Sequence, residues 1–248
     1  MPETTSSIKG HPVVSRDQWL GARTAFLAKE KEFTRQRDEL NRRRRALPWE
    51  RVDKRYVFDG PDGEEALADL FAGRSQLAVY HFMFDPKSEA GCPHCSFWAD
   101  HFDGAGVHLK HRDVTMVAVS RAPLAKIEAF RKRMGWRFKW VSSHGNDFNY
   151  DYRVSFTPEE VQSTGFYNYA DSKVGSEREG FSAFYRDEGG AVYHTYSTYA
   201  RGIDLLNGTY NILDLMPKGR DEDGLQFSQA WVRHHDRYEP VRPATAHA

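Results

Sequence analysis

Residues 77–84 read Leu-Ala-Val-Tyr-His-Phe-Met-Phe, residues 85–91 read Asp-Pro-Lys-Ser-Glu-Ala-Gly, and residues 92–98 read Cys-Pro-His-Cys-Ser-Phe-Trp. The first run contains β-branched and aromatic residues, which predicts a buried strand, and Pro86 and Gly91 mark a loop after it. Pro93 suits the first position of a helix, because the N–H that proline lacks is not needed there. The stretch therefore predicts a strand, a loop and a helix that begins near Cys92.

The two cysteines of the sequence, Cys92 and Cys95, lie at this predicted helix start with C-x-x-C spacing. One helical turn would bring both sulfur atoms to the same end of the helix. There, unpaired N–H groups and the helix dipole favour the thiolate of Cys92, and a protonated His94 adds positive charge. We therefore interpret the pair as a redox-active dithiol, and we expect no metal and no other cofactor.

A zinc site is the main alternative to a redox pair. Twelve residues separate Cys95 from His108, and His111 follows after two more, which nearly matches a two-Cys, two-His ligand set. The gap between the histidines is shorter than usual, and a long buried strand before Cys92 is not the context of a zinc finger. We interpret both histidines as polar residues of a turn.

Length and composition indicate one folded domain with appendages, because 248 residues with 40% hydrophobic and 14% aromatic content can bury a substantial core. Basic and acidic residues both number 35, so the formal net charge is zero. The protein therefore has no overall positive charge to attract nucleic acid or an anionic membrane. Residues 77–84 form the longest uncharged apolar run, far too short for a membrane span. The first ten residues lack the apolar core of a secretory signal, so we expect a cytoplasmic location and a mostly reduced dithiol.

The N-terminal region predicts one long helix from Ser15, with Gln18 completing a capping box, to about Ala46. Its apolar residues recur every seven positions and form a narrow stripe that must lie against the body of the protein or a second copy. We therefore expect the helix to dock on the body of the protein and to contribute to a homodimer. The arginines at 42–45 complement the helix dipole, and no aromatic residues are interleaved to indicate nucleic-acid binding. The stripe consists of Trp19, Phe26, Phe33, Leu40 and Leu47.

The remaining pattern alternates strands and helices, which is typical of an α/β unit with a parallel core. Ligands of such sheets collect at the carboxyl ends of the strands, where Cys92 is expected. We predict an N-terminal extension at 1–48, a domain at 49–216 with an insertion at about 142–180, and a tail at 217–248 packed on the domain. Expected strands are 52–58, 77–84, 114–119, 138–141, 181–186 and 191–196. Expected helices are 64–71, 123–134, 203–215 and one that runs from 92 to about 101 or 108.

This order of elements resembles the thioredoxin fold, which implies an α/β, three-layer architecture with a central mixed sheet. This chain adds to it the long N-terminal helix and the insertion before the C-terminal hairpin. Several motifs also resemble an uncharacterised bacterial thioredoxin-like family, domain of unknown function 899. That resemblance runs over nearly the whole chain and implies the fold more firmly than an activity. The motifs are Leu47-Pro-Trp49, Tyr80-His-Phe-Met-Phe84, Gly91-Cys-Pro-His-Cys-Ser96, Arg133-Met-Gly-Trp136 and His194-Thr-Tyr-Ser-Thr-Tyr-Ala-Arg-Gly202.

The resemblance to thioredoxins assigns further residues. His81 falls where thioredoxins place a buried carboxylate, so it would pass a proton to Cys95, unless it is a hydrogen-bonded core histidine. Glu179-Gly180 stands where thioredoxins carry a cis-proline, which implies that the insertion supplies the missing wall of the substrate site. Peroxiredoxin-like proteins place an arginine near the nucleophile, and Arg121 and Arg178 are the candidates.

The leading hypothesis is a thiol–disulfide oxidoreductase in which Cys92 attacks a protein or small-molecule disulfide and Cys95 resolves the mixed disulfide. Pro93 and Trp98, beside the cysteines, would contact the substrate. One alternative is a peroxiredoxin-like peroxidase, in which Cys92 becomes a sulfenic acid and Cys95 condenses with it. The other is a non-catalytic thioredoxin-like binding module whose aromatic insertion holds a ligand.

Overall fold

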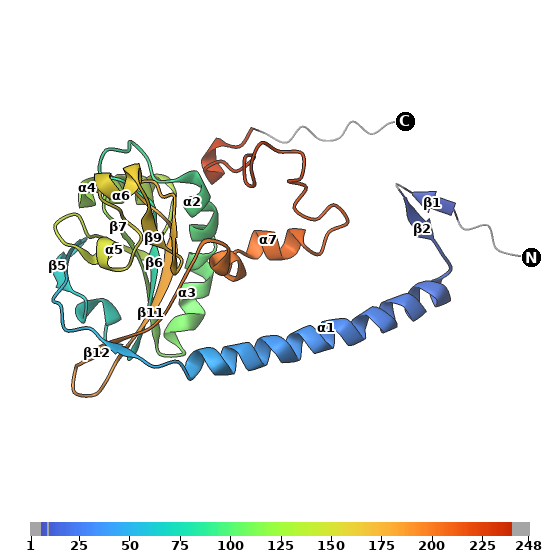
Figure 1. Cartoon of the computed structure of the whole chain (residues 1–248), viewed down its shortest axis with the longest axis horizontal. Coiled ribbons are helices and arrows are strands. Elements are labelled where there is room, and N and C mark those ends of the chain that lie inside the picture. The colour runs from blue at the N-terminus through green and yellow to red at the C-terminus, as the bar shows by residue number, and fades with distance from the viewer. Residues whose placement is uncertain (1–5, 9, 240–248) are drawn as a thin grey trace, which may run out of the picture. The chain divides into compact units, whose positions relative to one another are not determined.

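The computed structural model describes residues 6–8 and 10–239. The chain divides into two compact units, one up to Pro48 and one from Trp49, and each is described by itself (Figure 1). Within the described residues, no helix is long and apolar enough to cross a membrane.

The first unit consists of a small hairpin and a long helix. Strands β1 (Ser6–Ile8) and β2 (His11–Val13) pair antiparallel, and α1 covers Arg16–Arg45. The predicted capping box begins this helix: the Ser15 hydroxyl accepts from the Gln18 N–H at 3.3 Å, and the Gln18 side chain accepts from the Ser15 N–H at 3.0 Å. Helix α1 buries no residue, and its apolar stripe is exposed.

The second unit is built on one mixed sheet whose strands, within residues 49–239, follow the order β3-β12-β11-β6-β7-β8-β4-β5. Its strands are β3 (Glu50–Arg51), β4 (Val57–Gly60), β5 (Gly63–Ala66), β6 (Gln76–His81), β7 (Val114–Ser120), β8 (Lys139–Ser142), β11 (Gly180–Arg186) and β12 (Val192–Tyr199). Its helices are η1 (Asp69–Phe71), α2 (Pro93–Ala99), α3 (Phe102–Lys110), α4 (Leu124–Arg133), α5 (Phe148–Asp151), α6 (Pro158–Gln162), η2 (Ala200–Leu206), α7 (Gly208–Leu213) and η3 (His235–Arg237).

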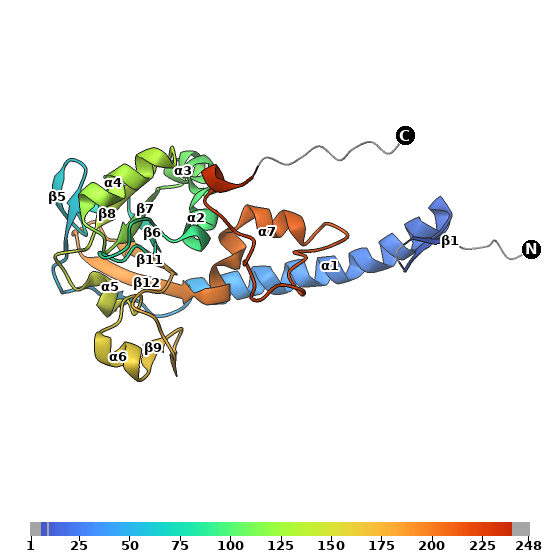
Figure 2. The ribbon, with the colours of Figure 1, turned by 90° about the horizontal axis from the view of Figure 1, so that it is seen from above.

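The topology of this sheet is thioredoxin-like, as predicted. Strands β6, β7 and β8 run parallel, while β11 pairs antiparallel with β6 and with β12. Helices α2, α3 and α4 cover one face of the sheet, and α5 lies on the other (Figure 2). The long apolar runs of β6 and β7 are therefore buried on both sides, as in the interior of a parallel sheet.

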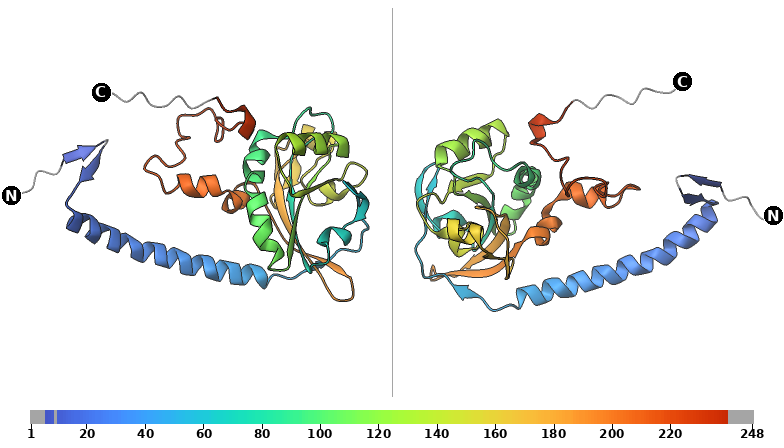
Figure 3. Two further views of the ribbon diagram at one scale, coloured as in Figure 1. Left: turned by 180° about the vertical axis from the view of Figure 1, so that it is seen from behind. Right: turned by 45° about the horizontal axis from the view of Figure 1, so that its top comes forward.

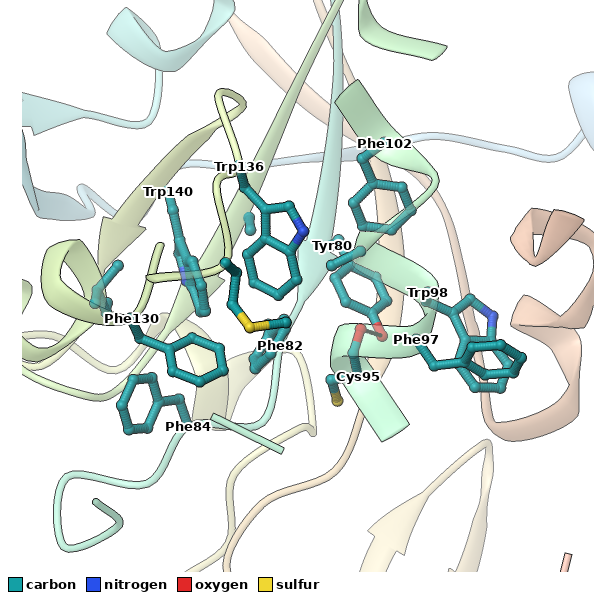
Figure 4. Close-up of a cluster of buried hydrophobic side chains, with 14 of the residues drawn as sticks. Tyr80, Phe82, Phe84, Cys95, Phe97, Trp98, Phe102, Phe130, Trp136 and Trp140 are labelled. Carbon is teal, nitrogen blue, oxygen red and sulfur yellow. Dashed lines mark hydrogen bonds between the residues drawn. The ribbon is translucent and has the colours of Figure 1, made fainter. Parts of the chain in front are cut away.

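Alternation along β6 divides its side chains between the two hydrophobic cores. Ala78 and Tyr80 face α2 and α4, whereas Leu77, Val79 and His81 face the opposite side. The core under α2 is aromatic: Figure 4 shows Cys95 and Tyr80 at one side of this cluster, with Phe130 and Trp140 at the other.

Two predicted regions are wrong. Of the strand expected at 52–58, only Val57 and Phe58 lie in a strand, β4, and residues 52–56 lie in none. Residues 64–71, expected to be a helix, instead form β5 and the short 3₁₀ helix η1. The turn at 60–63 folds the chain back, so that β4 and β5 form a hairpin. In its register Val57 pairs with Ala66 and Gly60 pairs with Gly63. Cross-strand pairing in this hairpin overrides the weak helical pattern. At Ala66, the last residue of β5, the backbone N–H donates to the Asp69 carboxylate at 2.8 Å.

The chain between β8 and β11 forms the expected insertion, with α5, α6 and a two-stranded sheet of β9 (Gly165–Tyr167) and β10 (Ala170–Ser172). It has a core of its own, which includes Phe156 and Tyr167 and packs on Tyr199 of β12. After α7 the tail continues to α2 (Figure 3). There Trp231 packs on Phe97, with 5.3 Å between ring centroids. Insertion and tail thus both lie in the unit that carries the cysteines.

Candidate active site

Cys92 is the residue that caps the start of α2, and Pro93 takes the first helical position, as predicted. The loop from β6 returns to the sheet here, because the Cys92 N–H donates to the Met83 carbonyl at 3.1 Å. The Cys92 carbonyl then accepts from the Ser96 N–H at 3.0 Å and from the Ser96 hydroxyl at 2.9 Å. These bonds fix the cysteine at the carboxyl end of β6.

The two cysteines are free thiols in different surroundings: Cys92 is half-buried and Cys95 is buried. Hydrogen bonds from the Cys95 thiol, from His94 and from the Cys95 N–H lower the pKa of Cys92 to about 5, against the opposing effect of burial. Burial and the neighbouring Cys92 sulfur raise the pKa of Cys95 well above its usual range. Near neutral pH the pair therefore holds one thiolate and one thiol.

Cys95 is held against the sheet by the residues that face α2. The Met83 N–H donates to the Cys95 sulfur at 3.4 Å, and the buried Tyr80 hydroxyl lies 3.5 Å from the Cys95 carbonyl oxygen. Phe82, Phe97 and Trp98 complete the apolar surroundings (Figure 4). Solvent hardly reaches this sulfur, so Cys92 is the more accessible of the two thiols.

His94 is positioned by the tail. Its ring packs edge-on against Phe227 at 6.1 Å between ring centroids. Its hydrogen bond with Cys92, together with the charge of that sulfur and a bond to the Gln229 backbone, raises the pKa of His94, which burial opposes. The thiolate and the imidazolium therefore stabilise each other.

A cleft of about 430 Å³ adjoins Cys92. One side, the helix wall, consists of Gly91, Cys92 and Pro93. Two segments distant in sequence complete the cleft: Gly175–Glu177 of the insertion and His234 of the tail, which we call the remote wall. The His234 Nε2 atom lies 2.9 Å from the Gly91 carbonyl oxygen, which ties the tail to the helix wall.

Glu177 is the buried carboxylate of the remote wall. Its oxygens accept from the Arg121 guanidinium at 3.0 Å and from the Ser155 hydroxyl at 3.0 and 3.1 Å. Burial raises the pKa of Glu177 to about 7, and nearby Asp85 adds to the rise, although Arg121 and Ser155 oppose it. The side chain therefore exchanges a proton in the pH range in which Cys92 is a thiolate.

Glu179 stands next to Gly180 at the start of β11. Its carboxylate accepts from the Tyr167 hydroxyl at 3.2 Å, and its negative charge contributes to the raised pKa values of Cys95 and His94. Gly180 is required at this point, because an added Cβ would lie 2.7 Å from the Tyr199 ring. The described chain contains no cis peptide bond, so this segment differs from the cis-proline loop of thioredoxins.

Two of the predicted site residues need correction. His81 was expected to exchange a proton with Cys95, but its ring lies on the opposite face of β6, stacked on Phe148 and Tyr152. Its Nε2 atom is 2.8 Å from the Ser182 hydroxyl, and burial lowers the pKa of His81 to about 3. It is thus the hydrogen-bonded core histidine of the alternative interpretation.

Trp98, expected to contact substrate, is buried in the core, where its indole N–H donates to the Ile203 carbonyl at 2.8 Å. Both errors have the same cause. Side chains close in sequence to the cysteines can point to another face, because they alternate along a strand and rotate around a helix. Of the residues beside the cysteines, Pro93 does line the cleft.

The two candidate arginines take different places. Arg121, directly after β7, pairs with Glu177 and lies over the Tyr150 ring at 4.7 Å, so it acts on the cleft through the carboxylate. The Arg178 guanidinium lies over Tyr167 and donates to the Lys173 carbonyl at 3.1 Å. Neither takes the place of a peroxiredoxin-like arginine bound to the nucleophile.

Sequence reasoning missed Glu177, Glu179, His234 and the support of His94 by Gln229. A single acidic residue in an insertion carries no local signal, and its role depends on Arg121 and Ser155, which are 56 and 22 residues away. Both histidines of the zinc alternative lie at the C-terminal end of α3, and no three potential metal ligands converge within the described residues.

Comparison with known proteins adds a family and a set of distant structural neighbours. The family described as bacterial protein of unknown function (DUF899) matches residues 8–238. No curated protein matches the sequence. Among solved structures, peroxidoxin BcpB from Mycobacterium tuberculosis is 13% identical, with a TM-score of 0.45 over 65% of this chain and 94% of that one.

Two further neighbours have related names. Peroxiredoxin Q from Xanthomonas campestris is 13% identical, with a TM-score of 0.41 over 62% of this chain and 87% of that one. A 1-Cys peroxiredoxin from yeast mitochondria is 16% identical, with a TM-score of 0.37 over 69% of this chain and 78% of that one. At these identities the likeness concerns the fold alone.

Proposed function

The chain belongs to the bacterial family of unknown function DUF899, and we propose that it is a thiol–disulfide oxidoreductase that uses Cys92 and Cys95. The observation that carries this proposal is the unequal placement of two free thiols one helical turn apart: Cys92 lies half-buried at the start of α2 and lines the cleft, whereas Cys95 is buried behind it. The pKa of Cys92 is accordingly lowered and that of Cys95 raised. A structural pair of cysteines needs no such difference, whereas a nucleophile and a resolving thiol do.

The reaction follows from these two states. The Cys92 thiolate attacks one sulfur of a substrate disulfide, a mixed disulfide forms, and the second substrate sulfur leaves with the bonding electrons. Cys95 then loses its proton and attacks the Cys92 sulfur, which releases the first substrate sulfur and leaves a Cys92–Cys95 disulfide. The substrate gains two electrons and two protons, and a dithiol reductant restores the enzyme.

A single-turnover assay tests the proposal. Protein reduced with dithiothreitol and freed from it is mixed with 2,2′-dithiodipyridine, and thiopyridone release is followed by absorbance. We expect two equivalents from the native chain, and a loss of at least ~10³-fold in rate for Cys92→Ser, which lacks the nucleophile.

Cys95→Ser is the matched control, because it keeps the nucleophile and removes only the resolving thiol. It should release one equivalent and retain the mixed disulfide, which mass spectrometry detects. Reaction of Cys92→Ser at the native rate would refute the proposal. Hydrogen peroxide consumption that is faster than disulfide reduction and depends on Cys92 would instead identify a thiol peroxidase.

We also propose that α1 mediates homodimerisation. Its apolar residues repeat every seven positions and are exposed, with Phe26 at 56% and Phe33 at 64%, and a seven-residue repeat fits packing against a second helix. Light scattering of the purified protein should give a dimer, and Phe26→Glu with Phe33→Glu should give a monomer. Equal masses for both proteins would contradict the proposal.

A further inference from the structure

Glu177 has a contact set that the exchange reaction above does not use. It is a carboxylate with 8% of its surface exposed, it lines the same cleft as Cys92, and it is bonded to Arg121 and Ser155. A carboxylate whose only task was to pair with Arg121 would be more stable at the surface, because burying a charge costs more than a partly screened ion pair returns. Its place beside the nucleophile indicates a role in the reaction.

We propose that Glu177 donates a proton to the leaving sulfur when Cys92 attacks a small, uncharged dialkyl disulfide. This inference rests on the proposed function and names the substrate class of that site. Dialkyl disulfides release strongly basic thiolates, so a proton donor in the cleft accelerates their reduction, whereas aromatic disulfides release stable thiolates that need none.

The step balances in atoms and electrons. The bond between the two substrate sulfurs breaks as the Cys92 sulfur bonds to one of them, and the other takes the electron pair and the Glu177 proton to leave as a thiol. The resulting Glu177 carboxylate stays paired with Arg121 at 3.0 Å, which stabilises the product of the transfer. Solvent then returns the proton to Glu177.

The surroundings of Glu177 fit this task. Among titratable and charged groups, Arg121 after β7 and Asp85 after β6 act directly on the Glu177 carboxyl, whereas Cys92 at the start of α2 and His234 in the tail line the same cleft. Burial and Asp85 keep the carboxyl protonated up to about pH 7, while Cys92 is already ionised. Between about pH 5 and 7 the cleft therefore holds a thiolate and a proton donor together.

The volume of the cleft, about 430 Å³, suits a small molecule, and apart from the Asp85 carboxylate its other lining residues are short or apolar, among them Met83, Ser88 and Ala90. No lysine or arginine lies among the lining residues to bind an anionic disulfide, and Arg121, which lies behind Glu177, is paired with it. These features favour an uncharged substrate.

The experiment compares two uncharged probes, bis(2-hydroxyethyl) disulfide and 2,2′-dithiodipyridine, in single turnovers from pH 6 to 9. With the native chain, the rate for the dialkyl probe should fall above about pH 7 as Glu177 ionises, and the rate for the aromatic probe should stay level. In Glu177→Gln, the dialkyl rate at pH 6 should fall by ~10²-fold and lose its pH dependence, which is the usual range for one proton donor. The aromatic rate should change by less than about twofold.

Two variants control for folding and for charge. Asp85→Asn removes the other carboxylate of the cleft, so the fall in the dialkyl rate should persist and move to lower pH. Ser155→Ala removes a hydrogen bond that favours the ionised carboxylate, so the fall should move to higher pH. If Glu177→Gln slows both probes equally, or slows neither, proton donation is refuted while the dithiol assignment stands. If the native chain does not react with the aromatic probe, the proposed function itself fails.

Discussion

The helix wall and the remote wall of the cleft are built in different ways. Gly91, Cys92 and Pro93 lie side by side in the chain, and their conformation follows from local rules for starting a helix. Glu177 and His234 reach the same cleft from segments that are 57 residues apart, and only the folded insertion and tail bring them there. The proposed nucleophile thus belongs to the helix wall, and the proposed proton donor, Glu177, belongs to the remote wall.

Among the substitutions that test this difference between the walls, His94→Asn should change the reactivity of Cys92 most. His94 belongs to the helix segment, but its side chain is held by the tail. Loss of the imidazolium removes a hydrogen bond and a positive charge from the Cys92 sulfur, so the pKa of Cys92 should rise. Iodoacetamide alkylation of the native chain should rise with pH around pH 5 and then level off. In the variant the rise should move by about one pH unit or more, with a roughly tenfold lower rate at pH 5.

Phe227→Leu is the matched control for this prediction, since it loosens the packing on the ring and keeps the imidazole. Its alkylation profile should lie between those of the native chain and His94→Asn. A native profile for His94→Asn would mean that the helix segment alone sets the reactivity of Cys92.

Arg121→Gln should have the next largest effect, confined to the remote wall. Arg121 favours the ionised form of Glu177, so its removal should raise the pKa of Glu177 above about 7 and move the fall in the dialkyl disulfide rate to higher pH by ~1 unit. The alkylation profile of Cys92 should stay within about 0.3 pH units of the native one. If the pH profiles of the dialkyl disulfide rate and of Cys92 alkylation both shifted, the charge of Arg121 would act on the helix wall as well as on the remote wall.

His81→Phe should have the smallest effect on the site, since His81 belongs to neither wall. Alkylation of Cys92 should be unchanged within about twofold. Stability should respond: the fold holds His81 neutral down to about pH 3, while the unfolded chain takes up a proton below its usual pKa of 6.5. The free energy of unfolding therefore decreases as pH falls below 6.5, and the variant should lose part of this decrease.

Chemical denaturation at pH 4.5 and 7.5 measures the difference between the native chain and His81→Phe. Ser182 keeps its hydrogen bond to Ser197 at 2.7 Å in either case, so the variant leaves no buried hydroxyl without a partner. A change in the pH profile of Cys92 alkylation in His81→Phe would show that His81 does influence the reactivity of Cys92.

Local patterns explain what was predictable. The capping box at Ser15, the buried runs of β6 and β7 and the helix start at Cys92 depend on neighbouring residues, and all three predictions are confirmed. The hairpin at 57–66 was predicted wrongly because its stability comes from cross-strand pairs. His81 and Trp98 were misplaced because the face of an element on which a side chain lies is decided by tertiary packing. Glu177 could not be found, because its chemistry depends on burial and on Arg121.

The contact between His234 and Gly91 has a consequence for biosynthesis, because it joins residues 143 positions apart. At a synthesis rate of roughly 5–20 residues per second, the dithiol leaves the ribosome about 7–30 seconds before the segment that covers it. During that interval His94 lacks its contacts with Phe227 and Gln229, and the new Cys92 is a weaker acid than in the finished fold. We therefore expect a growing chain to exchange disulfides with its neighbours less readily until its own site is complete.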